Sequence, residues 1–242
     1  TDFPTGTTRY TAGWRAVGAS LSEVAAMGAD ATAAVAVYAD ESFAPEELDR
    51  FVAGAVAVCE AVDAEYVGGS GAEPGDALCV TGQWGRSAAA LRLFERGARG
   101  GDGPNEDDSI RCANDLFRLT PRVADGLALV GDATAMMDSS DGLARSLHQL
   151  AEASEVGFAL DRGALPVHPA VDEVAADPAE RFELAAHFGE DFELVCTVPE
   201  PALDDVRERC PSGLVRIGSV VDADGGITAD GEPLPDRGYT HG

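Results

Sequence analysis

Asp138-Ser139-Ser140-Asp141-Gly142-Leu143 is the stretch that decides the fold, because it joins two regular elements through a tight turn. The apolar residues 133–137 precede it and are typical of a buried strand. Leu143, Leu147 and Leu150 recur at the spacing of one helix face. The order strand, turn, helix predicts helices layered on a sheet, which is an α/β (α+β) fold.

Two carboxylates, Asp138 and Asp141, stand three residues apart and would lie on one side of this turn. The amide groups of a helix start attract anions, but carboxylates repel phosphates unless a divalent cation lies between them. Mg²⁺ prefers carboxylate and phosphate oxygens, so the stretch predicts phosphate binding bridged by Mg²⁺. The alternative is a helix capped by Asp or Ser that binds no ligand.

The composition excludes several classes of protein. All 17 basic residues among the 242 are Arg, and the net charge at pH 7 is −26. The absence of Lys excludes a P-loop ATPase, a protein kinase and a Schiff-base enzyme for the residues of this sequence. So acidic a surface repels phosphate backbones, and we expect no nucleic acid as a partner. Because no apolar run is long enough to span a bilayer, we expect no membrane segment either.

The acidic, Lys-free composition resembles that of cytoplasmic proteins from salt-accumulating halophiles. We therefore expect the protein to lose structure when salt is removed, because salt screens the repulsion among its carboxylates. The five Cys residues are scattered and include no Cys-x-x-Cys pair, which favours a reducing, cytoplasmic location. Cys59 and Cys79 lie in apolar runs and are expected in the core.

We expect two domains, residues 1–69 and 70–242. The first would contain a helix that ends near Gly28, a strand at 32–38, a helix from Pro45 and a strand at 66–67. The second would have strands at 77–81, 133–137, near 158, 192–198 and 214–221, and helices through 94, from 121, from 143, at 171–185 and at 201–210. Residues 97–108, rich in Gly and Asp, predict a loop.

Five motifs resemble those of the thiamine-monophosphate kinase family, which shares a superfamily with aminoimidazole ribonucleotide synthetase. They are Ser-Leu-Ser-Glu-Val-Ala-Ala-Met-Gly-Ala at 20–29, Gly-Ala-Glu-Pro-Gly-Asp at 71–76, the stretch 137–143, Gly-Glu-Asp-Phe-Glu-Leu at 189–194 and Gly-Tyr-Thr-His at 238–241. The resemblance covers nearly the whole chain. It implies an aminoimidazole ribonucleotide synthetase-like fold, with an N-terminal mixed sheet for ATP binding and dimerisation and a C-terminal α/β domain.

The resemblance also implies a reaction, in which ATP and thiamine monophosphate give ADP and thiamine diphosphate with several Mg²⁺ ions in a homodimer. Asp138 and Asp141 would hold Mg²⁺, and Ser140 would contact ATP. Glu23 stands where the family has a metal-bridging Asp, and the alternative for it is a solvated helix charge. Gly69 is one of the few residues of the family's nucleotide-binding segment that this sequence retains. Like Ser140, it would contact ATP.

Three residues match the family's thiamine site. Glu190 would bind the thiamine moiety, since a carboxylate suits an aminopyrimidine donor. Tyr239 would stack on the cationic thiazolium, and Asp2 stands where the family usually has a substrate-contacting His. The alternatives are a loop charge for Glu190 and a surface aromatic for Tyr239. We expect no general base, because the acceptor phosphate oxygen is already ionised at neutral pH.

Several family motifs have no counterpart in this sequence. The opening Gly-Asp-Asp, the Thr-Asp strand and the metal-binding Asp after the family's Gly-Gly are absent, and Gly69 is followed directly by Ser70-Gly71. We expect the protein to carry these motifs in stretches outside this sequence. Three alternatives stay open: an aminoimidazole ribonucleotide synthetase-like enzyme, a non-catalytic nucleotide or thiamine-phosphate binding protein, and an acidic scaffold with no site.

Overall fold

The computed structural model describes residues 3–27, 47, 50–51, 53–54, 57–58, 71–95, 108–129 and 131–238, without the side chains of residues 23–27 and 108. The predicted strands at 32–38 and 66–67 lie outside these residues, as does nearly all of the predicted loop at 97–108. Asp2, Cys59, Gly69 and Tyr239 also lie outside them. The described positions between 47 and 58 are helical, in agreement with the helix predicted from Pro45.

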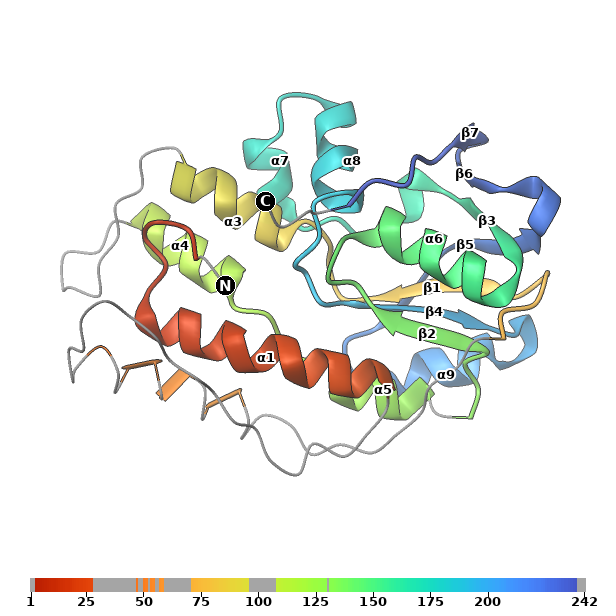
Figure 1. The fold of residues 1–242 in the computed structure, drawn as a ribbon, viewed down its shortest axis with the longest axis horizontal. Helices are drawn as coiled ribbons and strands as arrows, with labels where there is room; N and C mark the ends of the chain where they lie inside the picture. The colour runs from red at the N-terminus through yellow and green to blue at the C-terminus, as the bar shows by residue number, and fades with distance from the viewer. Residues whose placement is uncertain are drawn as a thin grey trace.

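Within the described residues, seven strands form one sheet in the order β2-β4-β1-β5-β3-β6-β7 (Figure 1). The strands are β1 (Ala77–Thr81), β2 (Ala135–Asp138), β3 (Val156–Leu160), β4 (Leu194–Val198), β5 (Leu214–Asp222), β6 (Ile227–Ala229) and β7 (Glu232–Pro233). Neighbouring strands in these residues run antiparallel except β3 and β6, which are parallel. The five strands predicted beyond residue 70 are confirmed, whereas β6 and β7 had no prediction.

The helices that the structure describes largely match the sequence pattern. They are α1 (Arg9–Met27), α3 (Arg86–Glu95), α4 (Asp108–Phe117), α5 (Val123–Leu129), α6 (Leu143–Ser154), α7 (Pro169–Val174), α8 (Pro178–Ala186) and α9 (Leu203–Arg209). Three short 3₁₀ turns, Arg162–Ala164, Glu200–Ala202 and Ala223–Gly225, complete them. The helix predicted from Pro121 begins two residues later, and α4 had no prediction. In these described residues, no helix is both long and apolar enough to cross a membrane.

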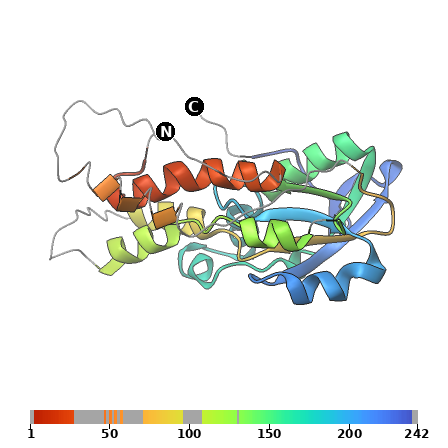
Figure 2. The ribbon, with the colours of Figure 1, turned by 90° about the horizontal axis from the view of Figure 1, so that it is seen from below.

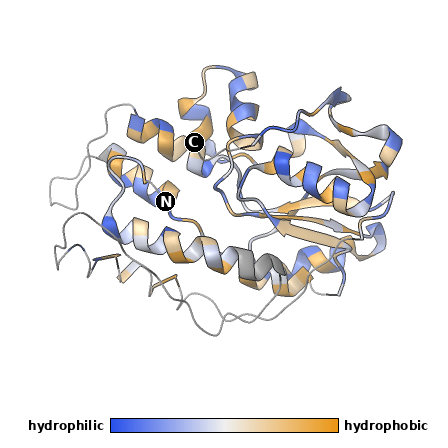
Figure 3. Ribbon diagram, viewed as in Figure 1, coloured by the Kyte–Doolittle hydropathy of each residue, from blue (hydrophilic) through white to orange (hydrophobic). Residues whose placement is uncertain are grey.

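The centre of the sheet is buried on both faces because helices cover it from two sides (Figures 1 and 2). Leu78 and Val80 of β1 belong to one hydrophobic cluster with α6, while Ala77 and Cys79 belong to another with α9. The alternation follows from the two-residue period of a strand. Figure 3 shows the consequence, since the central strands are mostly hydrophobic whereas α6 carries both hydrophobic and hydrophilic residues. The layered α/β architecture is therefore confirmed, and Cys79 lies in the core as predicted.

Helix α1 lies beside β2, α4 and α5 (Figure 1). It begins after Thr8, whose hydroxyl accepts a hydrogen bond of 3.1 Å from the amide of Thr11. Thr11, Arg15, Gly18 and Ser22 recur at helical spacing and are all buried. The helix therefore buries a polar face as well as an apolar one, and this polar face reaches the site described next.

Candidate functional site

The turn between β2 and α6 carries Asp138, Ser140 and Asp141. β2 ends at Asp138, and α6 begins after Gly142, whose φ of +104° suits glycine. Among the residues that the structure describes, the N-cap of α6 is Gly142, and no side-chain capping hydrogen bond is made there. The alternative of a helix capped by Asp or Ser is therefore wrong, and the Asp141 carboxylate is not used for capping.

A loop comprising residues 189–194, the site loop, is folded tightly against this turn. The amide of Glu190 donates to the carbonyl of Ser140 over 2.7 Å, and the amide of Phe192 donates to the carbonyl of Ser139 over 3.2 Å. Gly189, Glu190 and Phe192 have positive φ values of 82°, 63° and 53°. Two non-glycine residues in this sparsely populated region indicate a conformation imposed by the surrounding contacts.

Arg15 of α1 holds the site loop through Glu190. Its Nη2 donates to both the carbonyl oxygen and Oε2 of Glu190, each over 2.6 Å, and its Nη1 donates to the carbonyl of Phe117 over 3.0 Å. The guanidinium carbon lies 4.0 Å from the centre of the Phe117 ring and 5.4 Å from that of Phe192. Burial lowers the pKa of Arg15, and the charge of Glu190 opposes that shift.

The other two carboxylates of the site loop have partners in the surrounding fold. Asp191 accepts hydrogen bonds from the amides of Gly85 (2.5 Å) and Ser87 (2.9 Å), and so satisfies donors at the start of α3. Burial raises the pKa of the Asp191 carboxyl to about 6, although both amides favour its ionised form. Glu193 is paired with Arg122. These two residues therefore anchor the site loop to the start of α3 and to Arg122.

Ser22 brings the second half of α1 to the same place. Its hydroxyl donates to the carbonyl of Phe192 over 3.3 Å, and the amide of the same residue bonds the β2–α6 turn. Glu23 follows Ser22 in the helix, but its side chain lies outside the description. Its role as a metal ligand stays a prediction.

The C-terminal segment, residues 234–238, also ends at the β2–α6 turn. A Cβ atom on Gly238 would overlap the carbonyl oxygen of Asp141, so the two backbones are in close contact. Tyr239 follows Gly238 directly, although it lies outside the described residues. The described chain thus ends in contact with the β2–α6 turn, and the role of Tyr239 in the thiamine site stays a prediction.

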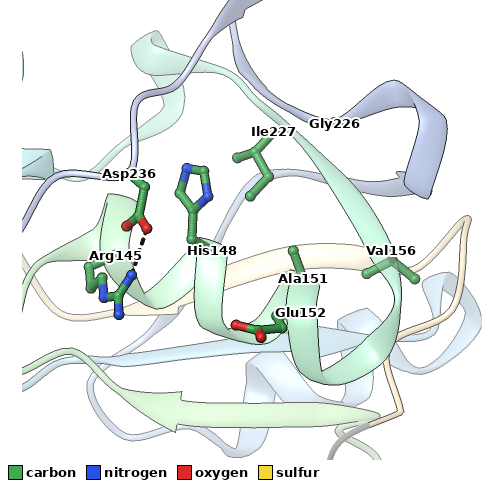
Figure 4. Close-up of a pocket in the computed structure, with 8 residues that line it drawn as sticks. All are labelled: Arg145, His148, Ala151, Glu152, Val156, Gly226, Ile227 and Asp236. Atoms are coloured by element: carbon green, nitrogen blue, oxygen red, sulfur yellow. Dashed lines mark hydrogen bonds and ion pairs between the residues drawn. The ribbon is translucent and has the colours of Figure 1, made fainter.

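A hollow of about 440 Å³ lies beside α6, β6 and the C-terminal segment (Figure 4). It is lined by Arg145, His148, Ala151, Glu152, Val156, Gly226, Ile227 and Asp236. Arg145 and Asp236 form an ion pair of 2.6 Å at its edge, and His148 Nε2 lies 2.9 Å from the carbonyl oxygen of Leu234. None of the site residues predicted from the sequence lines this hollow.

The structure therefore brings together four predicted residues, Asp138, Ser140, Asp141 and Glu190, at one junction of β2, α6 and the site loop. Asp2, Gly69 and Tyr239 cannot be placed from the residues it describes. Among these residues, no group of three or more His, Cys, Asp or Glu side chains could hold a metal ion. The third acidic ligand expected from the sequence is Glu23, whose side chain is not among them.

Sequence reasoning missed Arg15, Asp191 and Glu193. Arg15 carried one detectable signal, because it lies on the same face of α1 as Thr11 and Ser22 at spacings of four and seven residues. A charged residue on a helix face that is otherwise small or polar and buried indicates a specific partner elsewhere in the fold. Asp191 and Glu193 lie within the motif at 189–194, but nothing in that motif indicated their role, since their partners lie in distant segments.

Family models match both parts of the chain and define its class. The model described as "AIR synthase related protein, N-terminal domain" matches residues 1–84, and "AIR synthase related protein, C-terminal domain" matches residues 73–230. A "Thiamine-monophosphate kinase" of Halobacterium salinarum is 52% identical, with 100% of this chain and 87% of the relative covered. The chain therefore belongs to the thiamine-monophosphate kinase family.

Two further comparisons agree with this assignment. A thiamine-monophosphate kinase of Methanospirillum hungatei is 33% identical, with 99% of this chain and 84% of the relative covered. The crystal structure of thiamine-monophosphate kinase from Stenotrophomonas maltophilia is 27% identical, with a TM-score of 0.79 and coverage of 95% and 81% of the two chains. The alignment with the Halobacterium relative spans 265 positions, so that relative contains residues which this 242-residue sequence lacks.

Proposed function

We propose that this chain transfers the γ-phosphoryl group of ATP to thiamine monophosphate, giving ADP and thiamine diphosphate. One P–O bond forms between a phosphate oxygen of thiamine monophosphate and the γ-phosphorus, and the P–O bond to ADP breaks. The observation that carries the proposal is the contact between the β2–α6 turn and the site loop, in a chain whose relatives are thiamine-monophosphate kinases.

The proposed roles follow the position of each side chain. Ser140 would contact ATP beside the start of α6, where backbone amides favour phosphate. Glu190 would bind the aminopyrimidine with the part of its carboxylate that Arg15 leaves open, and its side chain is 19% exposed. Tyr239 and Asp2 would complete the thiamine site, and Gly69 the nucleotide site. Because the attacking oxygen is already ionised at neutral pH, these residues need only bind and orient the two substrates.

The residues at the turn fit Mg²⁺. Mg²⁺ is usually held in phosphate-transfer sites by one or two carboxylates together with substrate phosphates and water. Asp138 and Asp141 supply two such carboxylates, and Asp141 is free of helix capping. Glu23 would add a third. Mg²⁺ held there would neutralise negative charge on the two phosphate groups.

Three further assignments belong to the same proposal. We place the boundary between the ATP-binding and C-terminal domains at residues 1–69 and 70–242, and the overlap of the two family models near residues 73–84 supports a division there. We infer a homodimer, as the family resemblance implies. We infer a cytoplasmic enzyme, since the described cysteines, Cys79, Cys112, Cys196 and Cys210, are free thiols.

The proposal is tested by assaying Mg²⁺-dependent formation of thiamine diphosphate in molar KCl. The variant Asp141→Asn should lose turnover by at least about a hundredfold and keep the wild-type melting temperature, because the substitution removes a metal-binding charge without changing shape. Asp224→Asn, at an exposed position of a 3₁₀ turn, is the matched control and should keep full activity. Substrate binding without any turnover by the wild-type protein would instead identify a non-catalytic binding protein.

A further inference from the structure

Arg15 donates hydrogen bonds to segments that are distant in the sequence. Nη2 bonds the carbonyl oxygen and Oε2 of Glu190 over 2.6 Å, while Nη1 bonds the carbonyl of Phe117 and, more weakly, the hydroxyl of Ser87 over 3.3 Å. The side chain is 3% exposed. A buried guanidinium that bonds the site loop through Nη2 and two other segments through Nη1 fixes the position of that loop relative to them.

The contact with Glu190 is selective for one oxygen of its carboxylate. Oε2 accepts from Arg15, whereas Oε1 has no hydrogen-bond partner among the residues that the structure describes. The carboxylate is therefore anchored at one oxygen, and the other is left for an incoming donor. Ser87 adds a second anchor, because its hydroxyl donates to the carbonyl of Glu190 over 2.7 Å.

The anchored residue is also under backbone strain. Glu190 has a φ of +63°, and its amide donates to the carbonyl of Ser140 in the β2–α6 turn. A non-glycine residue keeps this conformation only when contacts on several sides impose it. Arg15 supplies the contact from the α1 side, so it connects the N-terminal helix to both the site loop and the turn.

We propose that Arg15 is a positioning residue for Glu190, which holds the carboxylate so that Oε1 receives the amino group of thiamine monophosphate. The inference rests on the proposed function, because it takes Glu190 as a contact of that substrate. Arg15 acts on substrate binding through Glu190 alone. Lys cannot replace it fully, because a single ammonium lacks the fork by which the guanidinium reaches acceptors in two different segments.

The test is a double-mutant cycle in molar KCl with Arg15→Met, Glu190→Gln and the double variant. KM values for thiamine monophosphate and for ATP, kcat and the melting temperature are measured for each. Arg15→Met should raise the KM for thiamine monophosphate by about tenfold or more, the factor expected for one charge-assisted hydrogen bond, and leave the KM for ATP unchanged. In the Glu190→Gln background the same substitution should add no further effect. Arg15→Lys keeps the positive charge and should restore part of the lost affinity. If Arg15→Met does not fold, the same measurements are made on Arg15→Lys.

Arg9→Met is the matched control, since Arg9 lies in the same helix and forms a half-exposed ion pair with Glu47. It should leave both KM values unchanged. Equal increases in the two KM values, or the same effect of Arg15→Met with and without Glu190→Gln, would overturn the positioning role and indicate a purely structural one. A wild-type protein that neither binds nor phosphorylates thiamine monophosphate would overturn the proposed function, and this inference with it.

Discussion

Arg122 and Glu193, a residue of the site loop, form a buried, bidentate ion pair. Nε of Arg122 donates to Oε2 of Glu193 and Nη2 donates to Oε1, each over 2.6 Å. Thr81 of β1 adds a third hydrogen bond to Oε2 over 2.8 Å. Since Glu193 belongs to the site loop and directly precedes β4, the pair joins the loop to the segment before α5.

Removing one member of this pair should destabilise the fold strongly. Arg122→Met leaves the Glu193 carboxylate buried without its cation, so we expect a loss of about 3 kcal/mol in the free energy of unfolding. Urea unfolding in molar KCl measures it. Arg181→Met removes an ion pair to Asp172 whose side chains are 37% and 57% exposed, and should cost less than about 1 kcal/mol. Equal losses in the two variants would contradict the importance of burial.

Gly189 should be far less tolerant of substitution than Gly131, although both have a φ of +82°. A Cβ on Gly189 would lie 2.6 Å from the carbonyl oxygen of Ser140, whereas a Cβ on Gly131 has nothing within 4 Å. Gly131→Ala should cost about 1 kcal/mol from backbone strain alone. Gly189→Ala adds a clash with the β2–α6 turn, so we expect a larger loss of stability and impaired binding of both substrates. Thermal unfolding and substrate titration measure these effects, and equal effects of the two substitutions would argue against the close packing of loop and turn.

The parts of the fold with strong local patterns could be predicted from the sequence. β2, the turn and α6 follow from an apolar run, two carboxylates and leucines at helical spacing, all within a few residues. α4 escaped prediction because it follows a Gly- and Asp-rich stretch. Its buried residues nevertheless recur at helical spacing and pack on α3; they are Ile110, Ala113, Leu116 and Phe117.

The long-range contacts that hold the site loop in place could not be predicted from local patterns. Arg15 and Glu190 are 175 residues apart in the sequence, and Asp191 and Ser87 are 104 apart. Such pairs are decided by the packing of α1 and α3 against the sheet, and no local period encodes them. The family resemblance identified Glu190, because it rests on the motif, but it carried no information about Arg15, Ser87 and Arg122, the partners outside the motif that hold it in place.

Asp191 should give the protein a pH dependence of the opposite sign to that of an ordinary paired carboxylate. Its pKa is raised from the usual 3.8 to about 6 by burial, so the native state binds the proton more tightly than the unfolded state. Its contribution to the free energy of unfolding therefore falls as the pH rises from about 4 to about 6, and is constant above that range. The difference in unfolding free energy between wild type and Asp191→Asn isolates this effect. A difference that grows with pH would contradict the raised pKa.

Salt removal should lower the melting temperature, because the chain carries a net charge of −26 and its Arg residues cannot neutralise all of its carboxylates. Screening acts over about 3 Å in 1 M salt and about 10 Å in 0.1 M salt, so repulsion between neighbouring surface carboxylates grows as KCl is diluted. Replacing three exposed acidic residues, by Glu208→Gln, Asp224→Asn and Glu232→Gln, should flatten this dependence without touching the site. The measurement is the melting temperature from molar to low KCl. A wild-type value that stays constant over that range would show that packing, not screening of surface charge, determines the stability of this protein.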